Sequence, residues 1–258
     1  MEIETCYMCD SASTSREHVP PRCIFPEARD LELALRKDLI TVPACAKHNT
    51  GKSADDEFLL VSLAGIIGNN TIGYRHKFTK VNRTIRRSAF RLLEEALKNP
   101  RSEILELEPN KFIQVIWGTP DHERLSKCFD HIARGLFFHH FGKKFNGKTR
   151  TLLGFTSNPA ANAQEFQRLI RNKVKMELGE KPRIGANPQV FSFQFTELDR
   201  DNTRSLHLQF FGGLDVFVGM TPPDWVPQDL AMELIRRGIA TTIKDGRDTY
   251  VFNSEARS

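Results

Sequence analysis

Hydrophobic residues recur at helical spacing in the first half of the chain. An apolar run over residues 58–68 predicts a buried helix that ends near Gly68, Asn69 and Asn70, which are turn-forming residues. A second helix is predicted over about residues 79–98, with Pro100 ending it soon after. Residues 1–57, in contrast, are rich in Cys, His, Pro and charged residues and show little periodicity.

The second half of the chain mixes helical and strand patterns. Amphipathic spacing predicts helices over residues 121–141 and 163–178. Strands are predicted over residues 111–117 and 151–155, and apolar residues at alternate positions predict two more over residues 191–195 and 206–210. The phenylalanines of the last two strands are expected to line one buried face of a sheet. The predicted fold class is therefore α+β, with a mixed, mainly antiparallel arrangement of strands.

The change of pattern along the chain predicts three segments. A small metal-organised module is expected over residues 1–60, and a helical connector with a basic face over residues 61–108. An α+β domain is expected over residues 109–258. The role of this domain stays open between target selection, dimerisation and partner binding.

The composition is ordinary for a globular protein and favours one kind of partner. Of the 258 residues, 40% are hydrophobic and 27% are charged. The net charge of +5 and the pI near 9.0 favour a polyanion as partner. The longest apolar run is about half the roughly 20 residues of a membrane helix, and the N-terminus lacks the features of a signal peptide. We therefore expect no membrane segment and a cytoplasmic location.

Two short motifs each carry two zinc-ligand side chains, Cys6 and Cys9 in the first and Cys45 and His48 in the second. Their two-residue spacings fit one tetrahedral zinc ion. Four protein ligands leave no open position for water, so the zinc is expected to be structural and necessary for folding of the module. Cys23 and Cys128 lack this spacing and are expected to be small core residues.

The residues around the second motif extend the pattern. Glu17-His18-Val19-Pro20 lies between the two motifs, and Asn49-x-Gly51-Lys52-Ser53 follows the second directly. The order of these pieces over residues 5–58 resembles the HNH endonucleases, a family of ββα-metal nucleases. Thr41-Val42-Pro43-Ala44-Cys45 is similar to the apolar strand that enters the second zinc motif in that family.

The resemblance implies a role for three residues. His18 corresponds to the general base, Glu17 to the acidic metal ligand beside it, and Asn49 to the last ligand of the HNH set. The middle Asn of the family motif has no equivalent here and is left unassigned. The chemistry of the residues agrees with these roles, because an ordinary histidine is largely neutral near pH 7 and can accept a proton from water. Carboxylate and amide oxygens suit a hard catalytic ion such as Mg²⁺ or Mn²⁺.

Basic residues provide candidates for DNA contact. Lys52 lies at the first turn of the apolar helix, where unpaired N–H groups attract phosphate, although this sequence lacks the first glycine of a P-loop. Further candidates share one face of the predicted second helix, in a stretch without acidic residues: Lys80, Arg83, Arg87 and Arg91. A solvated helix face is the alternative interpretation of this stripe.

Other chemically active side chains receive structural interpretations. Asp55, Asp56 and Glu57 lie in the first turns of the apolar helix, where an approach to the catalytic metal is one interpretation, but acids are expected there from the helix dipole and this second interpretation is preferred. His139 and His140 have no evident partners for a metal site and are expected to be structural.

These observations predict a metal-dependent HNH endonuclease that hydrolyses phosphodiester bonds in double-stranded DNA. Structural Zn²⁺ and catalytic Mg²⁺ or Mn²⁺ are the expected cofactors, and restriction or phage defence is the role that the resemblance implies. Two alternatives stay open. One is a zinc-dependent nucleic-acid-binding or protein-interaction module without catalysis, in which His18 has no role, and the other is an RNase with the same chemistry. A homodimer or a regulatory protein partner is also left open.

Overall fold

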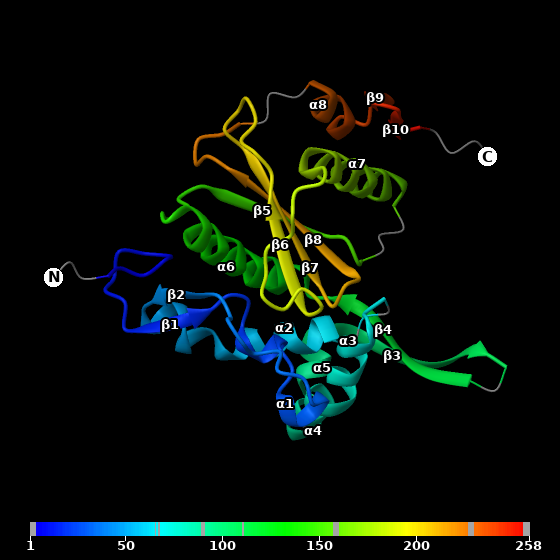
Figure 1. Ribbon diagram of the computed structural model, residues 1–258. Helices are drawn as coiled ribbons and strands as arrows, with labels where there is room; N and C mark the ends of the chain where they lie inside the picture. Colours follow the sequence, from blue (N-terminus) through cyan, green and yellow to red (C-terminus); the bar gives the residue numbers. More distant parts are fainter. Residues whose placement is uncertain are drawn as a thin grey trace. The chain divides into compact units, whose positions relative to one another are not determined.

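The computed structural model describes residues 4–64, 66, 68–88, 91–109, 111–156, 160–226 and 230–254. Helices and antiparallel sheets alternate along the chain (Figure 1), which confirms the predicted α+β class. The chain forms two compact units. The first consists of Met1–Phe145, Gly185–Ser192 and Phe210–Leu214, and the second of Asn146–Ile184, Phe193–Gln209 and Asp215–Ser258. The segment boundaries predicted at residues 60 and 108 both fall inside the first unit.

The first unit begins with two short strands followed by a helix. Strands β1 (Ser15–His18) and β2 (Thr41–Ala44) pair antiparallel, with His18 opposite Thr41. A 3-10 turn (Arg22–Ile24) and α1 (Ala28–Leu31) lie between the strands. After β2, two further 3-10 turns (Ala46–His48 and Thr50–Lys52) lead directly into α2 (Ser53–Ala64).

Helix α2 is buried along its second half. Its buried residues are Phe58, Leu59, Leu60, Val61, Leu63 and Ala64. A helix that is apolar on all sides must be enclosed by neighbours, and α2 packs against α5 (Arg91–Ala96) and α6 (His122–Phe141). The predicted buried helix is confirmed, although it ends at Ala64. Residues 65 and 67 of the predicted apolar run lie outside the described residues.

The prediction of one continuous helix over residues 79–98 is wrong. This region contains a π-helical turn (Lys77–Val81), α4 (Asn82–Arg87) and α5, and it is preceded by α3 (Thr71–His76). Ser88 ends α4, and its hydroxyl oxygen accepts a hydrogen bond of 3.3 Å from the backbone N–H of Leu92 in α5. Because helical spacing of apolar residues continues across such a break, periodicity alone does not reveal it.

A hairpin and a long helix complete the continuous part of the first unit. Strand β3 (Leu97–Glu108) was not predicted; it pairs antiparallel with β4 (Lys111–Pro120), which covers the predicted strand over residues 111–117. Helix α6 starts at Asp121, whose carboxylate accepts a hydrogen bond from the backbone N–H of Arg124, and ends at Gly142 in the left-handed conformation. The amphipathic helix predicted over residues 121–141 is thereby confirmed.

The second unit contains most of a four-stranded sheet in the order β5-β8-β7-β6. Its strands are β5 (Lys148–Leu153), β6 (Phe191–Phe195), β7 (Arg204–Phe210) and β8 (Leu214–Thr221). All five residues of β6 are buried, including Ser192 and Gln194, so the expectation of one buried face is wrong for this strand.

Helix α7 (Ala161–Leu178) packs both against the sheet and against the C-terminal elements. These elements are α8 (Leu230–Arg236), β9 (Thr241–Asp245) and β10 (Asp248–Phe252). Val174 and Leu178 of α7 pack against Phe217 of β8. Leu169, on the same helix, packs against Tyr250 and Phe252 of β10. The helix predicted over residues 163–178 is confirmed.

Candidate metal centre and adjoining pocket

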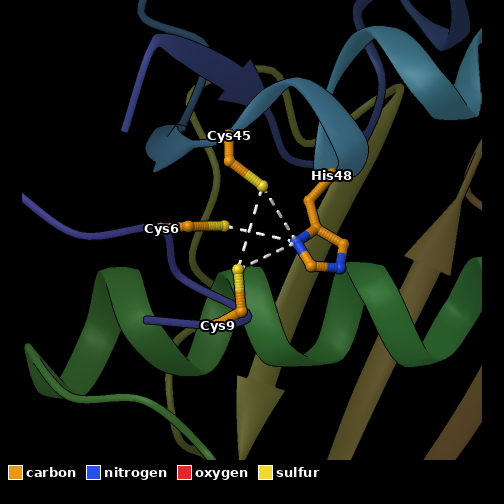
Figure 2. A group of neighbouring side chains, drawn as sticks. All are labelled: Cys6, Cys9, Cys45 and His48. Atoms are coloured by element: carbon orange, nitrogen blue, oxygen red, sulfur yellow. Dashed lines mark hydrogen bonds between the residues drawn. The ribbon is translucent and has the colours of Figure 1, made fainter. Parts of the chain in front are cut away.

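The four predicted zinc ligands form one cluster. Figure 2 shows Cys6, Cys9, Cys45 and His48 pointing toward a common centre, and their ligand atoms all lie within 4.8 Å of one another. The sulfur atoms of Cys6, Cys9 and Cys45 lie 3.4, 3.5 and 3.4 Å from Nδ1 of His48. The sulfurs of Cys9 and Cys45 are 3.8 Å apart.

These distances fit a tetrahedral zinc site. Zinc bond lengths of about 2.3 Å to sulfur and about 2.0 Å to nitrogen place two sulfurs about 3.8 Å apart, and a sulfur and a nitrogen about 3.5 Å apart. Three thiols and one imidazole are also soft donors of the kind that zinc prefers. The group can therefore hold a structural metal such as zinc, as the spacing of the two motifs predicted.

Local hydrogen bonds hold the ligand loops in place. The backbone N–H of Cys6 donates to the carbonyl of Ser11, and the backbone N–H of His48 donates to that of Cys45. Lys144 donates from Nζ to the carbonyl of Cys9 at 2.8 Å. The hydroxyl of Ser11 is the largest influence on the thiol of Cys9 and lowers its pKa to about 7. This favours the thiolate that a metal requires.

Asn49 connects the metal cluster to β1. Its side-chain nitrogen donates to Oγ of Ser15 at 2.8 Å and to the carbonyl of Arg16 at 3.3 Å. Because Asn49 follows the ligand His48 and β1 continues into Glu17-His18, the cluster helps to fix the strand that carries the predicted base. The amide nitrogen is thus directed at β1. A ligand role for Asn49 would fall to its carbonyl oxygen and stays a prediction.

A small pocket lies where β1, α2 and α6 meet. The space in it would hold about one water molecule. Its ionisable lining consists of Tyr7, Glu17, His18, Lys52, Asp55, Asp56, Cys128 and His131. The predicted base and the predicted acidic ligand therefore line the same pocket.

His18 has the properties that a general base needs. Burial lowers the pKa of its imidazole, and the positive charges of Arg22 and Arg36 lower it further. Within the described part of the chain, neither ring nitrogen of His18 has a hydrogen-bond partner, so a nitrogen is free to accept a proton. A neutral imidazole facing a pocket can accept a proton from water near pH 7.

Lys52 lies buried between two carboxylates. Its Nζ is 2.6 Å from Oε1 of Glu17 and 2.6 Å from Oδ1 of Asp56, and its side chain is only 8% exposed. Burial lowers the pKa of Lys52, but the carboxylates of Asp56 and Glu17 outweigh this effect, so the pKa is raised and the ammonium stays charged. The DNA contact predicted for Lys52 requires this arrangement to open, and it stays a prediction.

Five ionisable residues of the pocket were not predicted as site residues: Tyr7, Asp55, Asp56, Cys128 and His131. The acid Asp56 was interpreted as serving the helix dipole, yet its carboxylate binds Lys52. Burial lowers the pKa of His131 to about 4, and its ring meets the ring of the metal ligand His48 edge-on, with the centroids 6.1 Å apart. The sequence did contain an indication that His131 faces inward. It lies three residues after Cys128 and next to Ile132, which belong to the buried side of the predicted helix.

Two residues of the predicted basic stripe, Lys80 and Arg83, contact acids from a distant part of the sequence. Arg83 binds both carboxylate oxygens of Asp30, at 2.8 and 3.0 Å. The other side chains contact the following groups: Lys80 contacts Glu27, Arg91 contacts Glu95, and Arg87 contacts the hydroxyl of Thr84. The stretch around residues 75–93 contains no acids of its own. Its partners Glu27 and Asp30 lie about fifty residues earlier, so the local sequence gives no sign of these contacts. Contact between the stripe and DNA stays a prediction.

The remaining candidates lie apart from the metal cluster. The thiols of Cys23 and Cys128 point at the backbone carbonyls of Asp56 and Asp55, at 3.3 and 3.7 Å. Burial raises the pKa of both thiols to about 12. His139 and His140 are exposed at the end of α6.

Comparison with known proteins identifies no relative. No family model, curated protein or solved structure matches this chain. Among the described residues, no helix combines the length and the hydrophobicity that a membrane span needs.

Proposed function

We propose that the protein is a cytoplasmic, metal-dependent endonuclease of the HNH type that hydrolyses phosphodiester bonds in double-stranded DNA. One observation carries the proposal. Glu17 and His18 line a pocket against the first turns of α2, and Asn49 ties their strand to a cluster of three thiols and an imidazole. Restriction or phage defence is the cellular role that we propose with it.

His18 carries the chemical step in this proposal. Its neutral imidazole takes a proton from a water molecule, and the resulting hydroxide attacks the phosphorus while the P–O bond to the leaving oxygen breaks. The lowered pKa of His18 keeps the imidazole neutral at physiological pH. The fixed strand holds the base in one place relative to the phosphate, which reduces the entropic cost of the reaction.

Oxygen ligands for Mg²⁺ or Mn²⁺ come from Glu17 and Asn49 in this proposal, and Asp56 is close enough to Glu17 to add a third. When bound, such an ion neutralises charge on the phosphate and on the leaving oxygen. The donor types fit a hard cation. Zinc in the Cys3His cluster has a structural role only, because its four protein ligands leave no position for substrate.

Backbone contacts to DNA are proposed for Lys52, Lys80, Arg83, Arg87 and Arg91. Arg83 and Lys80 would exchange their carboxylate partners, Asp30 and Glu27, for phosphates. Such exchange makes binding depend strongly on salt concentration.

Cleavage of supercoiled plasmid with Mg²⁺ or Mn²⁺ tests the proposal. Wild type and His18→Ala are compared at matched zinc content, with His139→Ala as the control because His139 is an exposed histidine outside the pocket. We expect His18→Ala to cleave about 10²- to 10⁴-fold more slowly, which is the contribution of a general base, and His139→Ala to match wild type.

Two results would contradict the proposal. Equal cleavage by wild type and His18→Ala would show that the base is assigned wrongly. Zinc-dependent DNA binding without cleavage in either metal would instead favour a binding module that does not use His18.

A further inference from the structure

Two of the carboxylates that line the pocket with the predicted base already share a cation. The Lys52 ammonium lies 2.6 Å from an oxygen of Glu17 and 2.6 Å from an oxygen of Asp56. The side chains of Lys52 and Glu17 are 8% and 6% exposed. Carboxylates withdrawn from water in this way need a charged partner, and Lys52 supplies it.

The pocket leaves little room for a second cation. With Lys52 in place, it would hold about one water molecule. Mg²⁺ binds in octahedral geometry and keeps several of its waters. An ion at Glu17 would therefore need the volume that the ammonium occupies.

The charges around the pocket lead to the same conclusion. Asp55 is neutralised from α6, because Arg124 lies 2.9 Å and Lys127 lies 3.5 Å from its carboxylate oxygens. With both carboxylates ionised, Glu17, Asp56 and Lys52 then carry one net negative charge, and the two carboxylates alone would carry two. Coulombic attraction for a divalent ion is about twice as strong in the second case.

Building on the proposed function, we infer that Lys52 occupies the divalent-ion position between Glu17 and Asp56 and must leave before the ion binds. The flexible side chain then carries its ammonium out of the pocket, where a DNA phosphate becomes its new partner. Metal and DNA therefore bind cooperatively, and each raises the affinity for the other. This accounts for a buried lysine at a position where the sequence predicts a phosphate contact.

Mn²⁺ titration of the zinc-loaded protein, with free Mn²⁺ followed by electron paramagnetic resonance, tests this inference. We expect Lys52→Met to bind Mn²⁺ about tenfold more tightly than wild type, because two unpaired carboxylates attract the ion. The control Lys143→Met removes the same charge from an exposed lysine and should match wild type. Adding Glu17→Gln to Lys52→Met should abolish the gain. Mn²⁺ affinity of Lys52→Met no higher than wild type would overturn the inference.

A measurement on the wild type avoids any folding defect of the variant. Lysines are acetylated with and without saturating Mn²⁺, and the modified positions are read by mass spectrometry. We expect Lys52 to be protected without Mn²⁺ and to react when Mn²⁺ is bound. Equal reactivity of Lys52 in both states, with Mn²⁺ bound in one of them, would also overturn the inference.

The outcomes separate this inference from the proposed function. Tighter Mn²⁺ binding by Lys52→Met without plasmid cleavage by any protein would support the inference and contradict the nuclease. Cleavage that depends on His18 and Mn²⁺, with unchanged Mn²⁺ affinity in Lys52→Met, would support the nuclease and contradict the inference about Lys52.

Discussion

His76 shows what burial alone does to a histidine that the proposed chemistry does not use. It lies on α3 with no exposed surface, and its Nε2 is 3.2 Å from the carbonyl oxygen of Cys23. The ring therefore carries its proton on Nε2 and donates to this carbonyl, while the buried Nδ1 has no hydrogen-bond partner among the described residues. Burial is the main reason that the pKa of His76 is lowered to about 4. Protonation must then oppose folding.

We predict that titration of His76 lowers the free energy of unfolding as the pH falls. In the unfolded chain its pKa is about 6.5, so acid favours the unfolded state. The stabilisation is complete above pH 6.5 and is lost as the pH falls toward 4. Between pH 7 and pH 5, His76 should account for roughly 2 kcal/mol of lost unfolding free energy. His76→Gln cannot titrate and still donates to Cys23, so its stability should fall less over this range.

Urea unfolding of both proteins at pH 7 and pH 5 measures the difference. His122→Gln, which removes an exposed histidine, should keep the pH dependence of the wild type. The same loss of stability in His76→Gln and wild type would contradict the prediction.

At the scale of elements, α6 approaches the strand of the predicted base unusually closely. A Cβ atom added to Gly135 would lie 2.7 Å from Cγ2 of Val19 and 3.0 Å from Cγ1. Val19 directly follows His18, so this contact sets the distance between α6 and the pocket-lining end of β1. From the sequence, a glycine inside an amphipathic helix appears only as a weak helix former.

Gly135→Ala should therefore be harmful despite the better helix propensity of alanine. We expect a loss of roughly 1–3 kcal/mol of unfolding free energy from overpacking and slower plasmid cleavage through displacement of His18. Val19→Ala in the same chain should recover part of both losses, because it removes the overlapping methyl groups. A double-mutant cycle by urea unfolding quantifies this coupling, and additive effects of the two substitutions would argue against close contact.

The elements that depend on local spacing could be predicted from the sequence, and those that depend on distant partners could not. The zinc ligands, α2 and α6 follow from spacings of two to four residues. β3 was missed because nothing local separates it from the end of the preceding helix. The partner of Asp56 and the place of His131 depend on how β1, α2 and α6 pack together, and a linear pattern does not contain this packing.

For the whole molecule, a metal held by the Cys3His cluster would stabilise one unit in particular. All four ligands belong to the first unit, and so do the pocket residues. A Cys3His site contributes its binding free energy to folding. Removal of the metal should therefore affect the first unit before the second.

Cys45→Ser and Asn49→Ala should separate metal-dependent folding from catalysis. We expect Cys45→Ser to lose zinc, to lose cleavage and to exchange amide hydrogens faster over residues 4–64. Asn49→Ala should keep its zinc and lose cleavage, with about 1–2 kcal/mol of lost stability from its two hydrogen bonds to β1. Metal analysis, hydrogen exchange and the plasmid assay measure these effects. Normal zinc content and activity in Cys45→Ser would rule out the structural role of the cluster.

The first unit also takes in two late segments of the chain. Asn187 donates from its side chain to the carbonyl of Lys37 at 2.9 Å, and Asn70 donates to the carbonyl of Gln189 at 2.7 Å. The backbone N–H of Asn70 also donates to the carbonyl of Phe211. During synthesis, the candidate metal ligands thus leave the ribosome before the last pieces of their unit, which follow some 140 to 200 residues later. The first unit can therefore close around α3 only after residues 185–192 and 210–214 have been synthesised.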